Sequence, residues 1–133
     1  MWSQTSSYAL RTLGYLATHR DRWVLGKEIA EQTGIPANYL SKVLSQLRKK
    51  GMVRSLKGWG GGFQLREDAL SSPILGVLEL FDGARDAEAC LFGLPRCDAA
   101  NPCPLHSHWE RIRGEIDSML TTVTVGQLRK GPA

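Results

Sequence analysis

The sequence lacks any apolar run long enough to cross a membrane, and its N-terminal residues lack the apolar core of a secretory signal peptide. We therefore expect a cytoplasmic protein with no membrane partner, in a compartment where thiols stay reduced. Cysteine is also scarce: the 133 residues include three, which cannot all pair within one chain. This odd number favours metal binding or unpaired thiols over a disulfide framework.

The motifs of common enzymes are missing too. The glycine-rich segment Lys57–Gly62 does not end in the Lys-Ser/Thr pair of a phosphate-binding loop, which excludes a nucleotide site of that kind. No Ser-His-Asp arrangement and no pair of catalytic carboxylates stands out along the chain. We therefore predict that the protein is not an enzyme.

Acidic residues are absent between Glu31 and Glu67, and this window holds seven lysines and arginines. Residues 1–70 carry eleven Lys and Arg against five Asp and Glu, whereas residues 71–133 carry six against eight. A basic first half favours a polyanionic partner, because Lys and Arg release counterions from phosphates. The alternative is a basic surface that is merely solvated.

Apolar residues in the first fifty positions recur at helical spacing. The pattern predicts a first helix ending near residues 19–22, a second from about Gly26 to Gln32, and a third that begins at residues 35–37 and ends at Gly51. Two short strands, 52–56 and 63–65, enclose the glycine-rich segment. This order predicts a mainly α fold, a winged helix-turn-helix whose wing is a small β-hairpin.

The second half is predicted to contain two further helices. Ser72 and Pro73 predict the start of one, with Ser72 as its N-cap and Pro73 in its first turn. A long helix begins near Leu105, and Thr124 to Gln127 has capping-box spacing before a last short helix. The long helix carries an apolar stripe that a domain of this size cannot cover, which favours a partner subunit.

The polar face of the third helix and the wing supply candidate contacts to double-stranded DNA. The candidates for base edges in the major groove are Asn38, Ser41, Lys42 and Ser45. The candidates for phosphates are Lys49, Arg54 and Lys57, and Trp59 at the wing tip suits the sugar-phosphate backbone or the minor groove. The alternative is a winged helix that binds another protein.

A set of soft-metal ligands follows in one short stretch: Cys90, Cys97, Cys103 and His106. The gaps of six, five and two residues are wider than the Cys pairs of most zinc sites. Wide gaps suit a larger inorganic core such as an iron–sulfur cluster. A structural zinc site and incidental thiols remain as alternatives.

The chain resembles the Rrf2 family of bacterial winged-helix regulators, in particular its iron–sulfur, nitric-oxide-sensing and iron-sensing members. The motifs that carry the resemblance are Tyr8-Ala9-Leu10, Gly34-Ile35, Tyr39-Leu40, Leu47 to Gly51, Gly60 to Phe63, and the Cys/His positions with Trp109. The resemblance implies a homodimer joined by the long C-terminal helix. It also implies that three cysteines ligate a 2Fe–2S or 4Fe–4S cluster whose state tunes operator binding.

Three departures from the family pattern bear on the site. The first cysteine gap has six residues where the cluster-regulator branch has five, and Trp59 stands where that branch often has proline. No acid precedes Asp21, so an N-terminal aspartate ligand from the partner, as in the nitric-oxide-sensing branch, is absent. His106 matches the histidine of the cluster-regulator branch and is our choice for the fourth ligand, with His108 as its rival.

The resulting hypothesis divides the chain into a DNA-binding domain (1–81), a cluster-binding loop (82–104) and a dimerisation helix with its tail (105–133). We expect a transcriptional repressor whose cluster, 2Fe–2S in preference to 4Fe–4S, senses iron, redox state or nitric oxide. Two alternatives stay open: a DNA-binding regulator with structural zinc, and an iron–sulfur redox protein with an incidental basic face.

Overall fold

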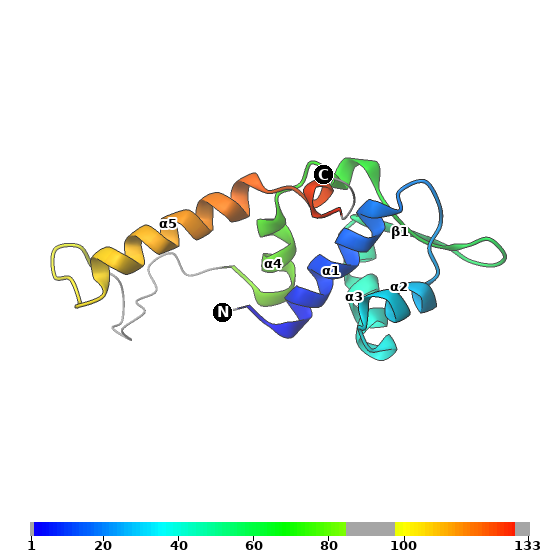
Figure 1. The fold of residues 1–133 in the computed structure, drawn as a ribbon, viewed down its shortest axis with the longest axis horizontal. Coiled ribbons are helices and arrows are strands. Elements are labelled where there is room, and N and C mark those ends of the chain that lie inside the picture. The colour runs from blue at the N-terminus through cyan, green and yellow to red at the C-terminus, as the bar shows by residue number, and fades with distance from the viewer. Residues whose placement is uncertain (1, 85–97, 130–133) are drawn as a thin grey trace.

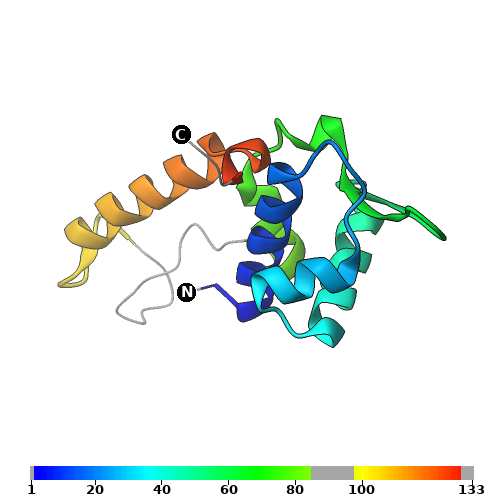
Figure 2. The same cartoon turned by 45° about the vertical axis from the view of Figure 1, so that its right-hand side comes forward.

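The computed structural model describes residues 2–84 and 98–129, and Figure 1 shows their arrangement. The first part of the chain folds into a body of helices with a hairpin at one side, from which one long helix projects. The view in Figure 2 shows the same projection from another side. No helix in the described ranges is long and apolar enough to cross a membrane.

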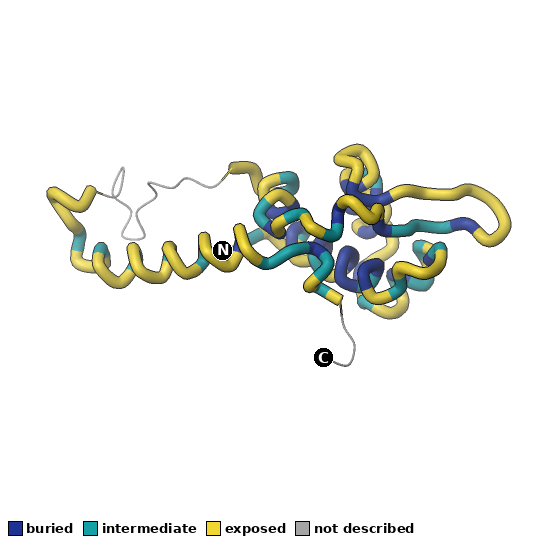
Figure 3. The backbone as a smooth tube through the Cα atoms, turned by 90° about the horizontal axis from the view of Figure 1, so that it is seen from above, coloured by how far each residue is buried: buried dark blue, intermediate teal, exposed yellow. Residues whose placement is uncertain are grey.

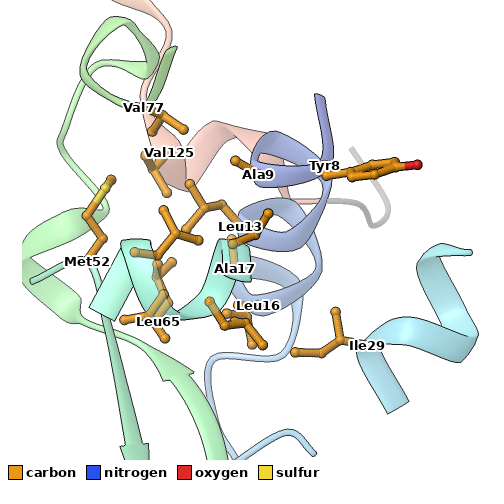
Figure 4. Close-up of a cluster of buried hydrophobic side chains, with 14 of the residues drawn as sticks. Tyr8, Ala9, Leu13, Leu16, Ala17, Ile29, Met52, Leu65, Val77 and Val125 are labelled. Atoms are coloured by element: carbon orange, nitrogen blue, oxygen red, sulfur yellow. The ribbon is translucent and has the colours of Figure 1, made fainter. Parts of the chain in front are cut away.

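The centre of the body is α1 (Gln4–Thr18), which the other helices and the hairpin surround. It begins where the Ser3 hydroxyl accepts a hydrogen bond from the Ser6 amide at 3.1 Å, because a side-chain oxygen satisfies an amide that has no partner inside the first turn. Leu13 of this helix has no exposed surface. Figure 4 shows it packed among side chains from several other elements.

The helix-turn-helix consists of α2 (Gly26–Thr33) and α3 (Ala37–Lys49), and both predicted helices are confirmed. Gly34 ends α2 in the left-handed conformation, at a φ of 74°, which a glycine adopts without steric cost. Pro36 then precedes the first residue of α3, where its missing N–H breaks no hydrogen bond. The turn therefore depends on a glycine that tolerates a positive φ and on a proline whose φ is fixed by its ring.

The wing is an antiparallel hairpin of β1 (Val53–Leu56) and β2 (Gly62–Leu65), in a register that pairs Val53 with Leu65. Val24, from the loop before α2, adds two backbone hydrogen bonds to Phe63, at 2.8 and 2.7 Å. This bridge requires Gly62, which has a φ of 139° and whose Cβ would lie 2.4 Å from the Val24 carbonyl oxygen.

The short 3-10 helix η1 (Glu67–Ala69) leads to α4 (Ile74–Asp82). The prediction that Ser72 caps this helix is wrong: Pro73 is the N-cap, and no side chain caps the first turn. The reason is a contact from far along the chain. The Ile74 amide donates to the Val123 carbonyl and the Val125 amide to the Ser72 carbonyl, both at 2.9 Å, so returning backbone replaces the side-chain cap.

The projecting helix is α5 (His106–Thr122), and Leu120 near its end is its one fully buried residue. Figure 3 shows that most of its length is exposed. The chain then turns back into η2 (Val125–Leu128), whose Val125 is buried in the core of the body. The predicted capping box is confirmed, since the Thr124 amide donates to Oε1 of Gln127 at 2.9 Å. These elements confirm the mainly α winged-helix fold.

Candidate DNA-binding surface and metal site

The outward face of α3 carries the residues predicted to contact bases. Leu40, Val43, Leu44 and Leu47 are buried on one side of the helix, which turns the polar positions toward solvent. The four predicted base contacts lie there, with Ser45 half-buried and the others exposed: Asn38, Ser41, Lys42 and Ser45. Lys49, predicted to contact phosphate, is exposed on the same helix. The helix therefore presents hydrogen-bonding and cationic groups together, as a recognition helix does.

Tyr39 adds an aromatic group to this face that the sequence analysis did not assign to DNA. Its side chain is 47% exposed although the ring packs against Tyr8 of α1, with ring centroids 6.1 Å apart. Nζ of Lys42 lies 6.0 Å from the centroid of the Tyr39 ring. α1 thus supports the start of the recognition helix through an aromatic contact.

The wing tip carries the next two predicted residues, Lys57 and Trp59, and both are exposed. The indole of Trp59 is fully exposed, which is unusual for the largest apolar side chain. Gly58 and Gly60 on either side have φ values of 92° and 70°, so the tip turns sharply and holds the ring away from the body. An exposed aromatic ring beside a lysine suits a nucleic-acid backbone.

Arg54, the remaining predicted contact, lies at the base of the wing in a different setting. Its guanidinium stacks over the Trp23 ring at 5.0 Å, and its Nε donates to Oε1 of Gln64 at 3.1 Å. Gln64 in turn donates to the backbone carbonyl of Arg20 at 2.9 Å. Hairpin register could have suggested Gln64, which is the cross-strand partner of Arg54, but no local signal points to Trp23.

The acid at the start of α2 is neutralised by its surroundings. Arg22 donates to both carboxylate oxygens of Glu28, at 3.0 and 2.6 Å, and the Tyr15 hydroxyl donates to the same carboxylate. The Arg22 hydrogen bonds, followed by that of Tyr15, lower the pKa of Glu28 to about 2. Burial is the main cause that raises the pKa of Tyr15.

Two of the four predicted metal ligands, Cys103 and His106, fall in the described residues, whereas Cys90 and Cys97 lie outside them. The two described ligands belong to one turn, because the His106 amide donates to the Cys103 carbonyl at 3.1 Å. His106 is the first residue of α5, and both side chains are half-buried. Within residues 2–84 and 98–129, no three His, Cys, Asp or Glu side chains group closely enough to hold a metal.

Glu110 is a functional candidate that the sequence analysis missed. Its Oε2 lies 3.0 Å from Nε2 of His106, one helical turn away on α5. A carboxylate on one ring nitrogen fixes the orientation of an imidazole and raises its strength as a ligand through the other nitrogen. The spacing of four residues on a predicted helix was the available signal.

The end of α4 is tied to the start of α1 by Asp82. Its Oδ2 accepts hydrogen bonds from the Ser3 amide at 3.1 Å and from the Ser6 hydroxyl at 2.7 Å. A hydrogen bond from the Ser3 side chain, followed by that from the Ser6 side chain and more weakly by that from the Ser3 amide, lowers the pKa of Asp82. The chain is therefore anchored to the body at Asp82, just before the segment that contains Cys90 and Cys97.

A protein-family model, Rrf2, described as "Iron-dependent Transcriptional regulator", matches residues 2–131. The match covers nearly the whole chain. The chain belongs to the Rrf2 family. It is accordingly a transcriptional regulator and not an enzyme, as the sequence predicts, and a DNA-binding role follows from that assignment.

Curated relatives of this Rrf2 protein carry consistent names. A protein of Aquifex aeolicus (strain VF5), whose name describes an HTH-type transcriptional regulator, is 39% identical over 130 residues, 96% of this chain and 90% of the relative. The HTH-type transcriptional regulator IscR of Yersinia pseudotuberculosis serotype O:1b (strain IP 31758) is 34% identical over 122 residues, 91% of this chain and 74% of the relative.

Solved structures share the fold of this Rrf2 protein. CymR (YrzC), the global cysteine regulator of B. subtilis, matches with a TM-score of 0.78 at 23% identity, covering 96% of this chain and 95% of that chain. T. potens IscR matches with a TM-score of 0.70 at 23% identity, covering 96% and 85%. At these identities the likeness concerns the arrangement of helices and wing.

Proposed function

We propose that this Rrf2 protein is a homodimeric repressor that binds double-stranded operator DNA and whose binding is controlled by an iron–sulfur cluster. Cys90, Cys97, Cys103 and His106 are the proposed ligands, and the cluster, 2Fe–2S in preference to 4Fe–4S, responds to iron, redox state or nitric oxide. One observation carries the proposal: Cys103 and His106 lie in the turn that leads into α5, and α5 is the helix whose apolar face is exposed.

DNA binding is proposed to use α3 and the wing together. Asn38, Ser41, Lys42 and Ser45 read base edges in the major groove, since they share the outward face of α3. The phosphate contacts are Lys49, Arg54 and Lys57, with Trp59 on the sugar-phosphate backbone. No acidic residue lies between Glu31 and Glu67, so this part of the chain carries positive charge alone, which favours a DNA duplex as partner.

The donor set suits a metal centre. Cys103 would supply a thiolate and His106 an imidazole from the turn that leads into α5, and Glu110 orients that imidazole through Nε2. Cys103 and His106 would then hold the metal together with Cys90 and Cys97. When bound, the cluster supplies iron–thiolate bonds that oxidants and nitric oxide break. The protein holds the ligands in place, with Asp82 anchoring the chain on one side and α5 on the other.

The homodimer is proposed to form along α5. Ile112 and Met119 are 43% and 44% exposed, and Trp109 and Ile116 are half-buried on the same helix. A helix of 17 residues that buries one of them against its own body has too little tertiary support to stay ordered alone. A second α5 packed against these residues would supply the missing apolar contacts.

The same helix connects the two functions. A change at Cys103 and His106 alters how α5 begins, and the other end of α5 leads through Val125 into the core that supports α3. We infer that cluster loss changes the spacing or the angle between the two recognition helices of the dimer, and with it the fit to two half-sites.

The test is purification without oxygen, followed by iron and sulfide counting and by absorption between about 300 and 500 nm, where thiolate-bound iron–sulfur clusters absorb. Cys103→Ala should abolish the colour and the iron, whereas His108→Ala, two residues from His106 on an exposed position, should retain both. If the purified protein contains zinc and no iron, the cluster proposal is wrong and the site is a structural zinc site.

Operator control is measured separately, on a duplex selected by the wild-type protein from a random-sequence pool. Holo and apo protein should bind this duplex with affinities that differ by about 5- to 150-fold at one salt concentration, the range of typical allosteric coupling. Equal affinities would contradict cluster control and leave DNA binding intact.

A further inference from the structure

Arg54 differs from the other basic residues of the DNA-binding surface in how firmly it is held. Two segments meet at its side chain: Trp23 stacks on the guanidinium from the loop before α2, and Gln64 accepts its Nε–H from β2. Gln64 is held in turn by the backbone carbonyl of Arg20, in the same loop as Trp23. A long side chain at the surface normally loses conformational entropy when it binds a partner. Here that entropy is already lost in the unbound protein.

The side chain of Arg54 points away from the core. Its neighbour Val53 and the cross-strand Leu65 are buried, and side chains alternate along a strand, so Arg54 and Gln64 lie on the outer face of the wing. Arg54 is exposed and lines an open hollow of about 1100 Å³. Its guanidinium carries five N–H donors in a planar fork, more than the bonds to Gln64 use.

The charges around the hollow leave Arg54 available to an anion. The basic residues that line it are Arg20, Arg54, Arg66 and Arg129, and the acids are Asp21, Glu67 and Asp68. Asp68 is paired with Arg66 at 3.3 Å. In the described part of the chain, Arg54 forms no salt bridge, and Gln64 orients it without neutralising its charge.

We propose that Trp23 and Gln64 are positioning residues that hold Arg54 in place for a phosphate of the DNA backbone at the base of the wing. The inference rests on the proposed DNA binding and adds a preorganised contact to it. A guanidinium fork matches two phosphate oxygens, and a ring beneath it preserves the fork's orientation. This contact orients the wing against the duplex and carries no sequence information.

A purely structural role for Arg54, locking the loop before α2 to the wing, makes different predictions from a phosphate contact. The structural role depends on shape, stacking and hydrogen bonds, whereas a phosphate contact also depends on charge. Loss of one phosphate contact reduces the slope of log K against log salt by about 1. The salt slope therefore distinguishes the two roles even where both variants bind more weakly.

The first experiment uses a mixed-sequence duplex of about three helical turns and salt between about 50 and 200 mM. Arg54→Gln should weaken binding roughly tenfold at 0.1 M salt and lower the slope by about 1, because one phosphate contact is lost. Arg54→Lys should keep the slope, since the charge remains. Arg66→Gln is the matched control: it removes the same charge from a residue already paired with Asp68, and it should leave the slope unchanged.

Gln64→Glu gives the sharpest contrast. The carboxylate would form an ion pair with Arg54 in the place of the present amide, which strengthens a structural lock but neutralises the guanidinium. We expect weaker binding and a slope lower by about 1, as for Arg54→Gln. Unchanged or tighter binding would overturn the phosphate contact in favour of the lock.

The positioning role is tested with Trp23→Leu. Loss of an exposed cation–π contact should weaken DNA binding about two- to fivefold at an unchanged salt slope. In the Arg54→Gln background the same substitution should have little further effect, because Trp23 acts through Arg54. Melting curves identify any variant that is unfolded, and Gln64→Ala then replaces Trp23→Leu as the positioning variant. Fully additive losses would overturn the positioning role.

These outcomes are separable from failure of the proposed function. If the wild-type protein binds no duplex, the proposed DNA binding itself is wrong. If the wild-type protein binds the duplex but the salt slope is unchanged in both Arg54→Gln and Gln64→Glu, only the proposed phosphate contact at the base of the wing is wrong.

Discussion

The body and the projecting α5 are both built from amphipathic helices, yet they bury their apolar residues to very different extents. Leu13, Ile29 and Leu47 of the body have no exposed surface. On α5, Ile112 and Met119 are nearly half exposed, and Leu120 alone is buried. Helical periodicity thus identifies an apolar face in both regions, but it does not say what covers that face.

The difference also separates folding from assembly. The body encloses its own core, which η2 completes by returning Val125 to it, so it has what a domain needs to fold alone. α5 lies outside that core for most of its length (Figure 3). Its order in the proposed dimer therefore depends on protein concentration, whereas the order of the body does not.

The largest expected effect comes from a change in the body core. Leu47→Ala should lower the free energy of unfolding by about 2–5 kcal/mol, because the substitution leaves a cavity beneath the recognition helix. Urea denaturation measures it. The matched substitution on the projecting helix, Met119→Ala, should cost the monomer less than about 0.5 kcal/mol. Equal losses would show that α5 belongs to the same cooperative core.

A change on α5 should act on assembly instead. Ile112→Ser should raise the dimer dissociation constant about tenfold or more, since loss of a large apolar contact at an interface costs upwards of about 1.4 kcal/mol. Sedimentation equilibrium measures the constant. Ser118→Ala, on the same helix, is the control for a change of side chain outside the apolar stripe. A dissociation constant unaffected by Ile112→Ser would place the dimer contact elsewhere.

Glycine-to-alanine substitutions in the body and in α5 should have opposite effects on stability. Gly62→Ala should destabilise the body by about 1–3 kcal/mol, because the residue has a φ of 139° and its Cβ would meet the Val24 carbonyl. Gly114→Ala in the middle of α5 meets nothing within 4 Å and should favour the helix by about 0.5–1 kcal/mol. Thermal melting and helical circular dichroism distinguish the two, and a stabilised Gly62→Ala would contradict the close contact at the wing.

The smallest effect is a pH dependence confined to the body. The folded pKa of Glu28, about 2, lies below its usual value of 4.5, so its contribution to stability is present above pH 4.5 and is lost as pH falls toward 2. Glu28→Gln should therefore lower Tm at pH 7, and its difference from wild type should shrink across that window. Glu115→Gln on α5 is the control. A difference that grows on acidification would have the wrong sign for a lowered pKa.

Much of the fold could be predicted from local patterns. The apolar stripe of α3, the glycine that ends α2 and the capping box before η2 all depend on residues within a few positions of one another. The predicted N-cap of α4 was wrong for the opposite reason. Ser72 is a good N-cap by its local sequence, but backbone from beyond α5 occupies that position.

The candidate sites divide in the same way. The polar face of α3 and the neighbouring ligands Cys103 and His106 follow from helical spacing. Trp23 beneath Arg54 does not, because the two are thirty-one positions apart in the chain and contacts such as the Val24–Phe63 bridge and the Gln64–Arg20 hydrogen bond bring their segments together. The hydrogen bonds of Asp82 with Ser3 and Ser6 likewise join residues that are 79 and 76 positions apart in the chain.

By itself, the sequence determined where most helices lie, which of their faces are apolar, where basic charge is concentrated and which residues are suited to bind a metal. These properties arise from backbone preferences and side-chain chemistry over one or two turns. The tertiary structure alone decided that the chain returns to the body after α5, that this returning backbone takes the place of a side-chain cap on α4, and that an indole and an amide hold Arg54. Those results depend on contacts between distant segments, whose meeting no local pattern encodes.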